Sequence, residues 1–275
     1  MPRADSAGLQ IDYTDVGHGE PALLLMSGWC ATREAFGRMN ELCAHHRRVL
    51  ALDWRSHGHS EESLQDFGAK DLLADALAVI QASGAELVVP VALSHAGWVA
   101  IELRRCLGER IPGLLLLDWI VLDPPQPFLA ALHALQDPRR WRQSRDQLFS
   151  LWLHGVDNPA VNEFVLDGMG SFEAAMWSCA GREIAAAYEK FGNPLTALKG
   201  LSPSVPVMHL YAQPPDPAYL EAQQAFAATH PWFKVRRINA RSHFPMLEEP
   251  EEMAQAAEDF VEGLAMADGM RLKVG

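Results

Sequence analysis

The stretch that decides the fold is Leu87-Val-Val-Pro-Val-Ala-Leu-Ser94-His95-Ala96-Gly97, an apolar run that passes directly into a helical pattern. A continuous apolar run of this length is typical of a strand buried on both faces of a parallel sheet. Small residues, Ala92 and Ala96, flank Ser94 two positions away on each side. A tight strand-to-helix turn needs small residues there because it brings neighbouring backbone close to the serine. The stretch therefore predicts a nucleophile elbow, which exposes a serine at the carboxyl end of a central strand.

Strands and amphipathic helices alternate on both sides of this elbow. Such alternation predicts an α/β fold with a mostly parallel central sheet and helices on both faces. The predicted strands are Gln10–Asp15, Ala22–Met26, Val49–Asp53, Leu87–Leu93, Leu114–Asp118, Val205–Tyr211 and Lys234–Ile238. The predicted helices are Glu34–Cys43, Ala69–Ala82, His95–Leu107, Pro217–Thr229 and Pro250–Leu264.

The alternation stops between the strand Leu114–Asp118, which we call strand 6, and the next strand, Val205–Tyr211. Residues 123–199 show helices and loops but no strand pattern, and they are rich in aromatic side chains such as Trp152 and Trp177. We expect this segment to be a helical cap inserted after strand 6, with residues 1–122 and 200–275 forming the core domain. A cap of this kind, placed over the carboxyl edge of a parallel sheet, would enclose an apolar pocket.

Composition narrows the class of protein. The 275 residues carry a net charge of −12, which disfavours nucleic acid or an anionic membrane as a partner because counterion release needs clustered Lys and Arg. No stretch approaches the roughly 20 apolar residues of a membrane helix, and the first residues lack a signal-peptide core. We expect a cytoplasmic protein. Of its four cysteines, Cys43, Cys106 and Cys179 are interpreted as buried apolar side chains, while Cys30 lies in a candidate site loop.

A catalytic histidine and acid complete the pattern. His243 follows the last predicted strand and precedes the last helix, as the chain order serine, acid, histidine requires. The acid has two candidates, Asp118 at the end of its strand and Asp216 after the penultimate strand. We prefer Asp118, because a buried carboxylate at a sheet edge needs a partner and an imidazolium supplies one.

Two loops complete the predicted site. The backbone N–H of His95, at a helix start, points to an oxyanion hole, and Trp29 in Ser27-Gly-Trp-Cys30 is the second expected donor. The loop Asp53-Trp-Arg-Ser-His57-Gly-His59-Ser60 is interpreted as structural. No carboxylate at suitable spacing completes a metal site with its histidines, so His57 and His59 are interpreted as surface residues.

Several segments together resemble one known family. They are Ser27-Gly-Trp-Cys, Asp53-Trp-Arg, Ser94-His with Gly97-Trp98, Asp118-Trp119, Phe149-Ser-Leu-Trp152, Met176-Trp177, Gln213-Pro214 and His243-Phe-Pro. The chain is similar to the cofactor-independent 2,4-dioxygenases of 3-hydroxy-4(1H)-quinolones, ring-cleaving enzymes with the α/β-hydrolase fold. Gly-Trp-Cys and the Asp-Trp after strand six are not general features of hydrolases, which makes the resemblance specific.

The resemblance implies chemistry without a metal, flavin or other cofactor. His243 would deprotonate the 3-hydroxyl of the substrate and Asp118 would support it, after which the anion reacts with O₂ and the ring opens with loss of carbon monoxide. Ser94 would bind the substrate by a hydrogen bond. The N–H groups of Trp29 and His95 would stabilise the C4 oxygen. Trp152, Trp177 and Cys30 would line the site.

The chain departs from the family at Ala31, where several members carry His. With the small cap residues Gly168, Gly170, Ala174 and Ala175, this change favours the branch that cleaves 2-alkyl-3-hydroxy-4-quinolones such as the Pseudomonas quinolone signal. Two alternatives stay open at this point. One is a serine esterase that uses Ser94, His243 and Asp216, and the other is a non-catalytic small-molecule receptor.

Overall fold

The computed structural model describes residues 1–267, and residues 268–275, which end the expected core domain, lie outside the described residues. Eight strands form one sheet in the order β1-β2-β4-β3-β5-β6-β7-β8. The strands are β1 (Arg3–Ser6), β2 (Leu9–Val16), β3 (Ala22–Met26), β4 (Val49–Leu52), β5 (Val88–Leu93), β6 (Leu114–Leu117), β7 (Val207–Tyr211) and β8 (Phe233–Arg237). The first two strands pair antiparallel, and every pairing among β3 to β8 is parallel.

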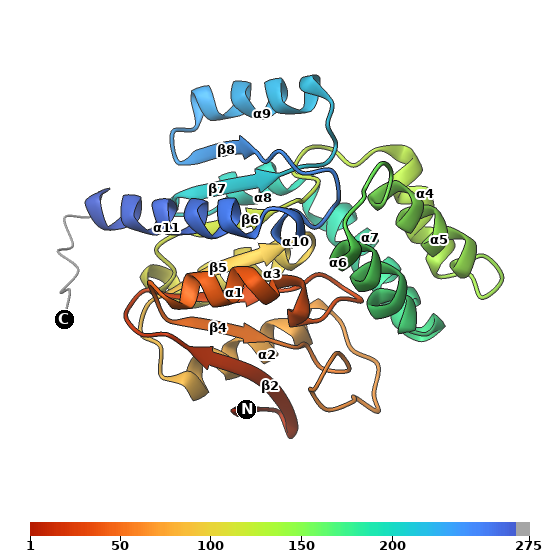
Figure 1. The fold of residues 1–275 in the computed structure, drawn as a ribbon, viewed down its shortest axis with the longest axis horizontal. Helices are drawn as coiled ribbons and strands as arrows, with labels where there is room; N and C mark the ends of the chain where they lie inside the picture. The colour runs from red at the N-terminus through yellow and green to blue at the C-terminus, as the bar shows by residue number, and fades with distance from the viewer. Residues whose placement is uncertain (268–275) are drawn as a thin grey trace.

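Helices cover both faces of this sheet. They are α1 (Gly37–Ala44), α2 (Ala69–Ser83), α3 (Ala96–Leu107), α4 (Gln126–Leu135), α5 (Trp141–Trp152), α6 (Pro159–Glu163), α7 (Ala174–Phe191), α8 (Pro194–Lys199), α9 (Pro217–Thr229), α10 (Pro245–Glu248) and α11 (Pro250–Ala267). Helices α1 and α11 lie in front of the sheet in Figure 1, and α2, α3 and α8 lie behind it. The sequence pattern of an α/β-hydrolase fold is thereby confirmed.

The core strands form because their residues are apolar without interruption. Every residue of β3, β4, β5 and β6 is buried, which is the pattern of strands covered on both faces. Gly68 caps the N-terminus of helix α2, and its N–H donates to the carboxylate of Asp71 over 2.9 Å. On α3, Gly97 packs under the ring of Trp119, since a Cβ there would lie 2.2 Å from that ring. The elbow helix is therefore held close to the end of β6.

Helices α4 to α7 follow β6 and gather at the carboxyl ends of the strands, to the right of the sheet in Figure 1. Two side chains of α7 reach the loop before α2. Arg182 forms a bidentate pair with Asp66, with both N···O distances 3.0 Å, and Glu183 accepts the Ala69 N–H over 2.8 Å. These bonds connect α7 to the start of α2 beside the expected site.

Three details differ from the sequence prediction. Strand β1 was not predicted, because a four-residue edge strand gives too short an alternation to be read. The predicted helix Glu34–Cys43 begins as a 3₁₀ turn over Arg33–Phe36 before α1. Cys106 was predicted to be buried, and this is wrong: it is exposed on the outer side of α3, where the helix faces solvent, whereas the other three cysteines are buried.

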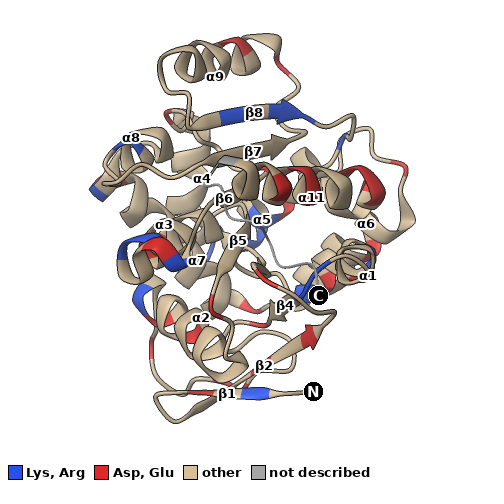
Figure 2. Cartoon of the chain, turned by 90° about the vertical axis from the view of Figure 1, so that its left-hand side faces the viewer, with Lys and Arg blue, Asp and Glu red and all other residues tan. Residues whose placement is uncertain are grey.

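Charged residues are distributed over the surface without one continuous basic region in the view of Figure 2. The basic edge strand β8 lies near the acidic helix α11, and Arg236 pairs with Glu252 between them. Charged side chains on an edge strand discourage pairing with another sheet. Among residues 1–267, no helix has the length and apolar character needed to cross a membrane.

Candidate active site

The described structure brings His243 and Asp118 together at the carboxyl edge of the sheet. Asp118 follows β6 and is 3% exposed, and His243 lies in the loop before α10. The distance between His243 Nδ1 and Asp118 Oδ1 is 2.7 Å. The other carboxylate oxygen of Asp118 accepts the N–H groups of Ala212 (2.6 Å) and Gln213 (3.1 Å). The carboxylate thus has three hydrogen-bond partners, which fix its orientation.

The tautomer of His243 follows from this arrangement. An ionised carboxylate only accepts hydrogen bonds, so the proton of neutral His243 lies on Nδ1 and the lone pair lies on Nε2. An imidazole in this state is ready to take a proton at Nε2. Trp152 stacks on the ring of His243, with centroids 5.0 Å apart and planes 18° apart, and restricts the ring to this position. The pair is arranged as a general base with an orienting carboxylate.

Asp216, the alternative acid, has a different role. Its side chain accepts the Ala218 N–H over 2.9 Å and caps the N-terminus of α9. A capping carboxylate of this type stabilises a helix by satisfying one of its free N–H groups. Within residues 1–267, the His243 side chain has one hydrogen-bond partner, Asp118. The structure therefore favours Asp118 as the partner of the histidine.

Ser94 lies on the neighbouring strand end and has the backbone of an elbow. Its φ is +53°, a value that non-glycine residues seldom adopt, and its N–H donates to the Leu117 carbonyl over 2.7 Å. Gly28 packs against it, since a Cβ at Gly28 would lie 3.6 Å from the Ser94 Cβ. Within residues 1–267, no hydrogen bond joins the Ser94 hydroxyl to the His243 ring. The Ser94 side chain is buried, with 9% of its surface exposed, and among the described residues it lacks the hydrogen bond to a histidine that would activate a serine nucleophile.

The loop Ser27–Cys30 is held in place by His57. This histidine was predicted to be a surface residue, and the prediction is wrong: its side chain is buried, because its ring packs beside the rings of Trp29 and Phe172, with centroids 6.3 Å and 4.9 Å away. Its Nε2 accepts the Cys30 N–H over 3.1 Å and its Nδ1 donates to the Arg55 carbonyl over 2.9 Å. Burial lowers the pKa of His57 to about 4, which keeps it neutral and able to accept. His59 is exposed, as predicted.

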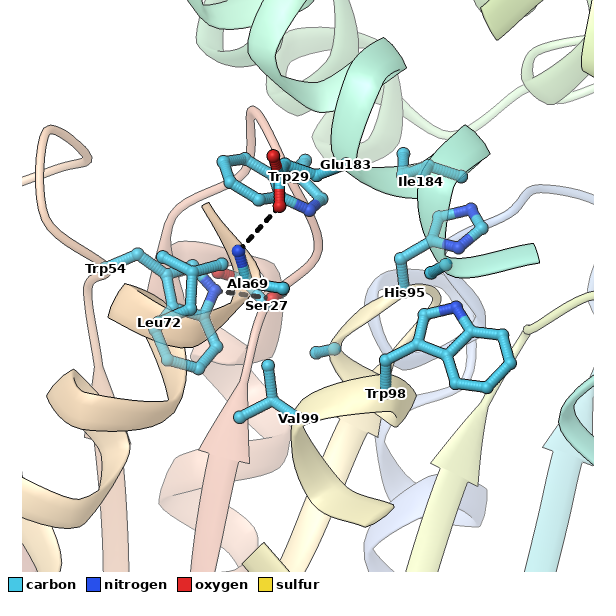
Figure 3. A pocket seen from close by; sticks show the side chains of 12 residues that line it. Ser27, Trp29, Trp54, Ala69, Leu72, His95, Trp98, Val99, Glu183 and Ile184 are labelled. Carbon is cyan, nitrogen blue, oxygen red and sulfur yellow. Dashed lines mark hydrogen bonds between the residues drawn. The ribbon is translucent and has the colours of Figure 1, made fainter. Parts of the chain in front are cut away.

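The remaining predicted site residues occupy three positions. The rings of Trp29 and His95 line a cavity of about 20 Å³ between α2, α3 and α7, which Figure 3 shows. The His95 Nδ1 is buried without a partner among the described residues, and burial lowers the pKa of His95 to about 3. Trp177 of α7 is buried against Phe149 of α5, and the Cys30 thiol is buried in the core, where desolvation raises its pKa.

Sequence reasoning did not find His209. It lies in the middle of the apolar strand β7, is fully buried, and its Nε2 is 3.3 Å from the backbone N of Trp119. The sequence did offer one signal for a functional role of His209, since a lone histidine within an apolar strand needs hydrogen-bond partners. No group of three or more His, Cys, Asp and Glu side chains in the described part of the chain is placed to hold a metal ion.

Comparison with known proteins decides the family. A model of the alpha/beta hydrolase family matches residues 22–256. The chain is 36% identical over 258 residues, 93% of its own length and 96% of the relative's, to a 2-heptyl-3-hydroxy-4(1H)-quinolone dioxygenase of Mycobacteroides abscessus. It is 35% identical, over 93% of its length and 97% of the relative's, to the 1H-3-hydroxy-4-oxoquinoline 2,4-dioxygenase of Pseudomonas putida.

The chain belongs to the 3-hydroxy-4-quinolone 2,4-dioxygenase family. A solved structure of a variant of AqdC, which recognises and cleaves the ring of the Pseudomonas quinolone signal and was captured with that substrate, superposes with a TM-score of 0.92 at 35% identity. The match covers 95% of this chain and 99% of that one. Membership in this family makes the protein an enzyme of the oxygenase class, and the family resemblance seen in the sequence is confirmed.

Proposed function

We propose that the protein cleaves a 2-alkyl-3-hydroxy-4(1H)-quinolone with O₂ to give an N-acylanthranilate and carbon monoxide, without a cofactor. The observation that carries the proposal is the His243–Asp118 pair, a base with a free Nε2 and no activated serine beside it. The named activities of the relatives supply the substrate class. The buried cysteines are free thiols, which is compatible with the cytoplasm as the compartment we propose.

The first step on this proposal is proton transfer. His243 Nε2 takes the proton of the 3-hydroxyl, and the positive charge that forms on the ring is stabilised by Asp118. The substrate becomes an electron-rich anion with charge shared between the oxygens at C3 and C4. Ser94, at the adjacent strand end, donates a hydrogen bond to the substrate, a role that requires no activation of its hydroxyl.

The second step uses O₂ as the oxidant. The anion adds O₂ at C2, and the resulting peroxide attacks the C4 carbonyl to form a cyclic peroxide. Cleavage of the O–O bond together with the C2–C3 and C3–C4 bonds releases C3 with its oxygen as carbon monoxide. One atom of O₂ stays in the new acyl carbonyl at C2 and the other in the carboxylate at C4, so atoms balance. The proton held by His243 returns to solvent.

Negative charge that develops on the C4 oxygen needs hydrogen-bond donors to stabilise it. We propose the backbone N–H groups of His95, the residue after Ser94, and of Trp29, in the loop whose Gly28 packs against Ser94. The left-handed conformation of Cys30 (φ +57°) and its bond to His57 fix the loop that carries Trp29. Fixed backbone donors are effective because they do not reorganise as the charge forms. Trp152, Trp177 and Cys30 complete the proposed binding site.

We also propose that residues 123–199 act as the cap of the site. The cavity beside Trp29 and His95 holds little more than one water molecule, so a two-ring substrate cannot lie within it alone. Binding on this proposal requires α7 to shift from the start of α2, where Arg182 and Glu183 connect them. The closed cap then excludes water from the peroxide.

The test is a direct assay. Purified, chelator-treated protein is mixed with 2-heptyl-3-hydroxy-4(1H)-quinolone in air while substrate absorbance, O₂ uptake and released CO are recorded. We expect one O₂ consumed and one CO formed for each quinolone. The corresponding quinolones with hydrogen or methyl at C2 serve as matched substrates, which measure the preference of the enzyme for a long 2-alkyl group. No consumption of any of the three would contradict the proposal.

A further inference from the structure

Polar side chains of β7 and α9, two of them fully buried, lie around the turn that follows β6. His209 lies opposite Leu116 in the parallel β6–β7 register, two residues before Asp118 on the neighbouring strand. Its Nε2 is 3.3 Å from the backbone N of Trp119, the residue after Asp118. Its Nδ1 is 2.6 Å from Oε1 of Gln223 on α9. Both ring nitrogens are therefore engaged.

The direction of these hydrogen bonds is fixed. The amide nitrogen of Gln223 donates to the Tyr219 carbonyl over 3.2 Å, so its oxygen faces His209. The Nδ1 of His209 must then carry the proton, and Nε2 carries the lone pair that accepts the Trp119 N–H. Burial lowers the pKa of His209 to about 4. The nearby Asp118 carboxylate favours protonation of His209, but burial outweighs this effect. The His209 ring therefore stays neutral at pH values where His243 serves as a base.

A second side chain, Tyr219 of α9, holds the same turn. The Tyr219 hydroxyl donates to the Trp119 carbonyl over 2.9 Å and accepts the Val121 N–H over 3.0 Å. Between these contacts and β6, Asp118 adopts a φ of +42°. A non-glycine residue keeps such a conformation only when its surroundings impose it. Without this conformation, the carboxylate would not point along the sheet edge toward His243.

We propose that His209, whose tautomer is set by Gln223, is a positioning residue that holds the Asp118 turn and so keeps the carboxylate directed at His243. The effect of His209 on catalysis rests on the proposed function, because His209 would act by orienting Asp118 and, through it, the proposed base His243. Tyr219 supports the same turn through the next peptide. None of these three side chains contacts the reacting atoms, so their effect passes through Asp118.

The experiment compares His209→Leu, which removes both hydrogen bonds, with His209→Gln, which offers an acceptor toward Trp119 and a donor toward Gln223. Two readouts are recorded for each variant. One is kcat and KM for the 2-heptyl quinolone across pH. The other is the proton NMR resonance of the His243 Nδ1–H bound to Asp118, which needs no substrate.

We expect His209→Leu to lower kcat about tenfold or more, because small displacements of catalytic groups are costly, while KM changes little. The His243 proton resonance should shift or disappear through faster exchange, and the pH profile of kcat/KM should move. The variant His209→Gln should recover most of kcat and the resonance. His57→Leu is the matched control, since it removes an equally buried imidazole that holds the other loop, and it should leave the His243 resonance in place.

Three outcomes would overturn the inference: a folded His209→Leu protein with wild-type kcat and an unchanged resonance, a His209→Gln protein as impaired as His209→Leu, or the same loss of the resonance in His57→Leu. If His209→Leu does not fold, Gln223→Leu and Tyr219→Phe carry the same test, and an unaltered resonance and kcat in both would overturn it. If the wild type consumes no quinolone but the resonance still depends on His209, the proposed function fails and the positioning role stands.

Discussion

The ends of β5 and β6 lie side by side in the sheet and share an unusual backbone, yet they are built for different purposes. Ser94 and Asp118 both have positive φ values, +53° and +42°. Asp118 receives three hydrogen bonds at its carboxylate, and its turn is held by His209 and Tyr219. The Ser94 hydroxyl has no bond to His243 within residues 1–267. The comparison teaches that hydrogen bonds fix Asp118, which supports the proposed base, more firmly than the Ser94 hydroxyl, for which we propose only a role in substrate binding.

The largest effect is expected from His243→Ala, which removes the proposed base. A general base contributes up to about 10⁴-fold in rate, so we expect kcat to fall by about 10³-fold or more. Steady-state CO release with the 2-heptyl quinolone measures the loss. A retained rate within tenfold of wild type would remove His243 from the chemical step.

A smaller but still severe loss is expected from Asp118→Asn. The amide oxygen can still accept the N–H groups of Ala212 and Gln213, which leaves the NH₂ group facing His243. The imidazole must then place its proton on Nε2, where it cannot act as a base. We expect kcat to fall by about 10²-fold with the fold intact. Circular dichroism checks the fold, and activity near that of wild type would contradict the assigned tautomer.

The neutral histidines that hold the two loops predict a dependence of stability on pH. His57 and His209 have folded pKa values of about 4, below the ordinary 6.5, so the unfolded chain binds more protons as pH falls. The contribution of each histidine to the free energy of unfolding is complete above pH 6.5. It is lost as the pH falls from 6.5 to 4, by up to about 3 kcal/mol for each histidine.

Urea unfolding across this pH range measures that dependence. The variant His209→Gln removes one of the buried histidines whose pKa is lowered, so the free energy of unfolding should vary less steeply with pH. A curve that is flat between pH 6.5 and 4, or one that His209→Gln leaves unchanged, would show that these side chains are not buried as neutral acceptors.

The smallest effect is expected from Ser94→Ala. It removes one hydrogen bond to the substrate, which is worth about 1 kcal/mol and corresponds to a loss of about twofold to tenfold. The loss should appear in kcat/KM, and a covalent serine probe should not label the wild type in step with inactivation. If Ser94→Ala were as inactive as His243→Ala, the proposal that the two strand ends have different roles would be wrong.

Local patterns were enough to predict the parallel sheet, the elbow and the pairing of His243 with Asp118. The elbow was visible because an apolar strand, small residues and a helix start coincide within eleven positions from Leu87 to Gly97. The roles of His57 and His209 were not predictable in this way. Each depends on a partner N–H in a distant loop, 27 residues away for Cys30 and 90 residues away for Trp119. Such pairings appear only when the sheet brings strand ends together.

The most direct test of the central claim separates proton transfer from the reaction with O₂. Wild type, Ser94→Ala and His243→Ala are each mixed with the 2-heptyl quinolone under strictly anaerobic conditions, and the absorbance of the bound substrate anion is recorded. We predict that the anion forms in wild type and in Ser94→Ala and is missing in His243→Ala. Anion formation in His243→Ala equal to wild type, or its absence in Ser94→Ala alone, would contradict the account.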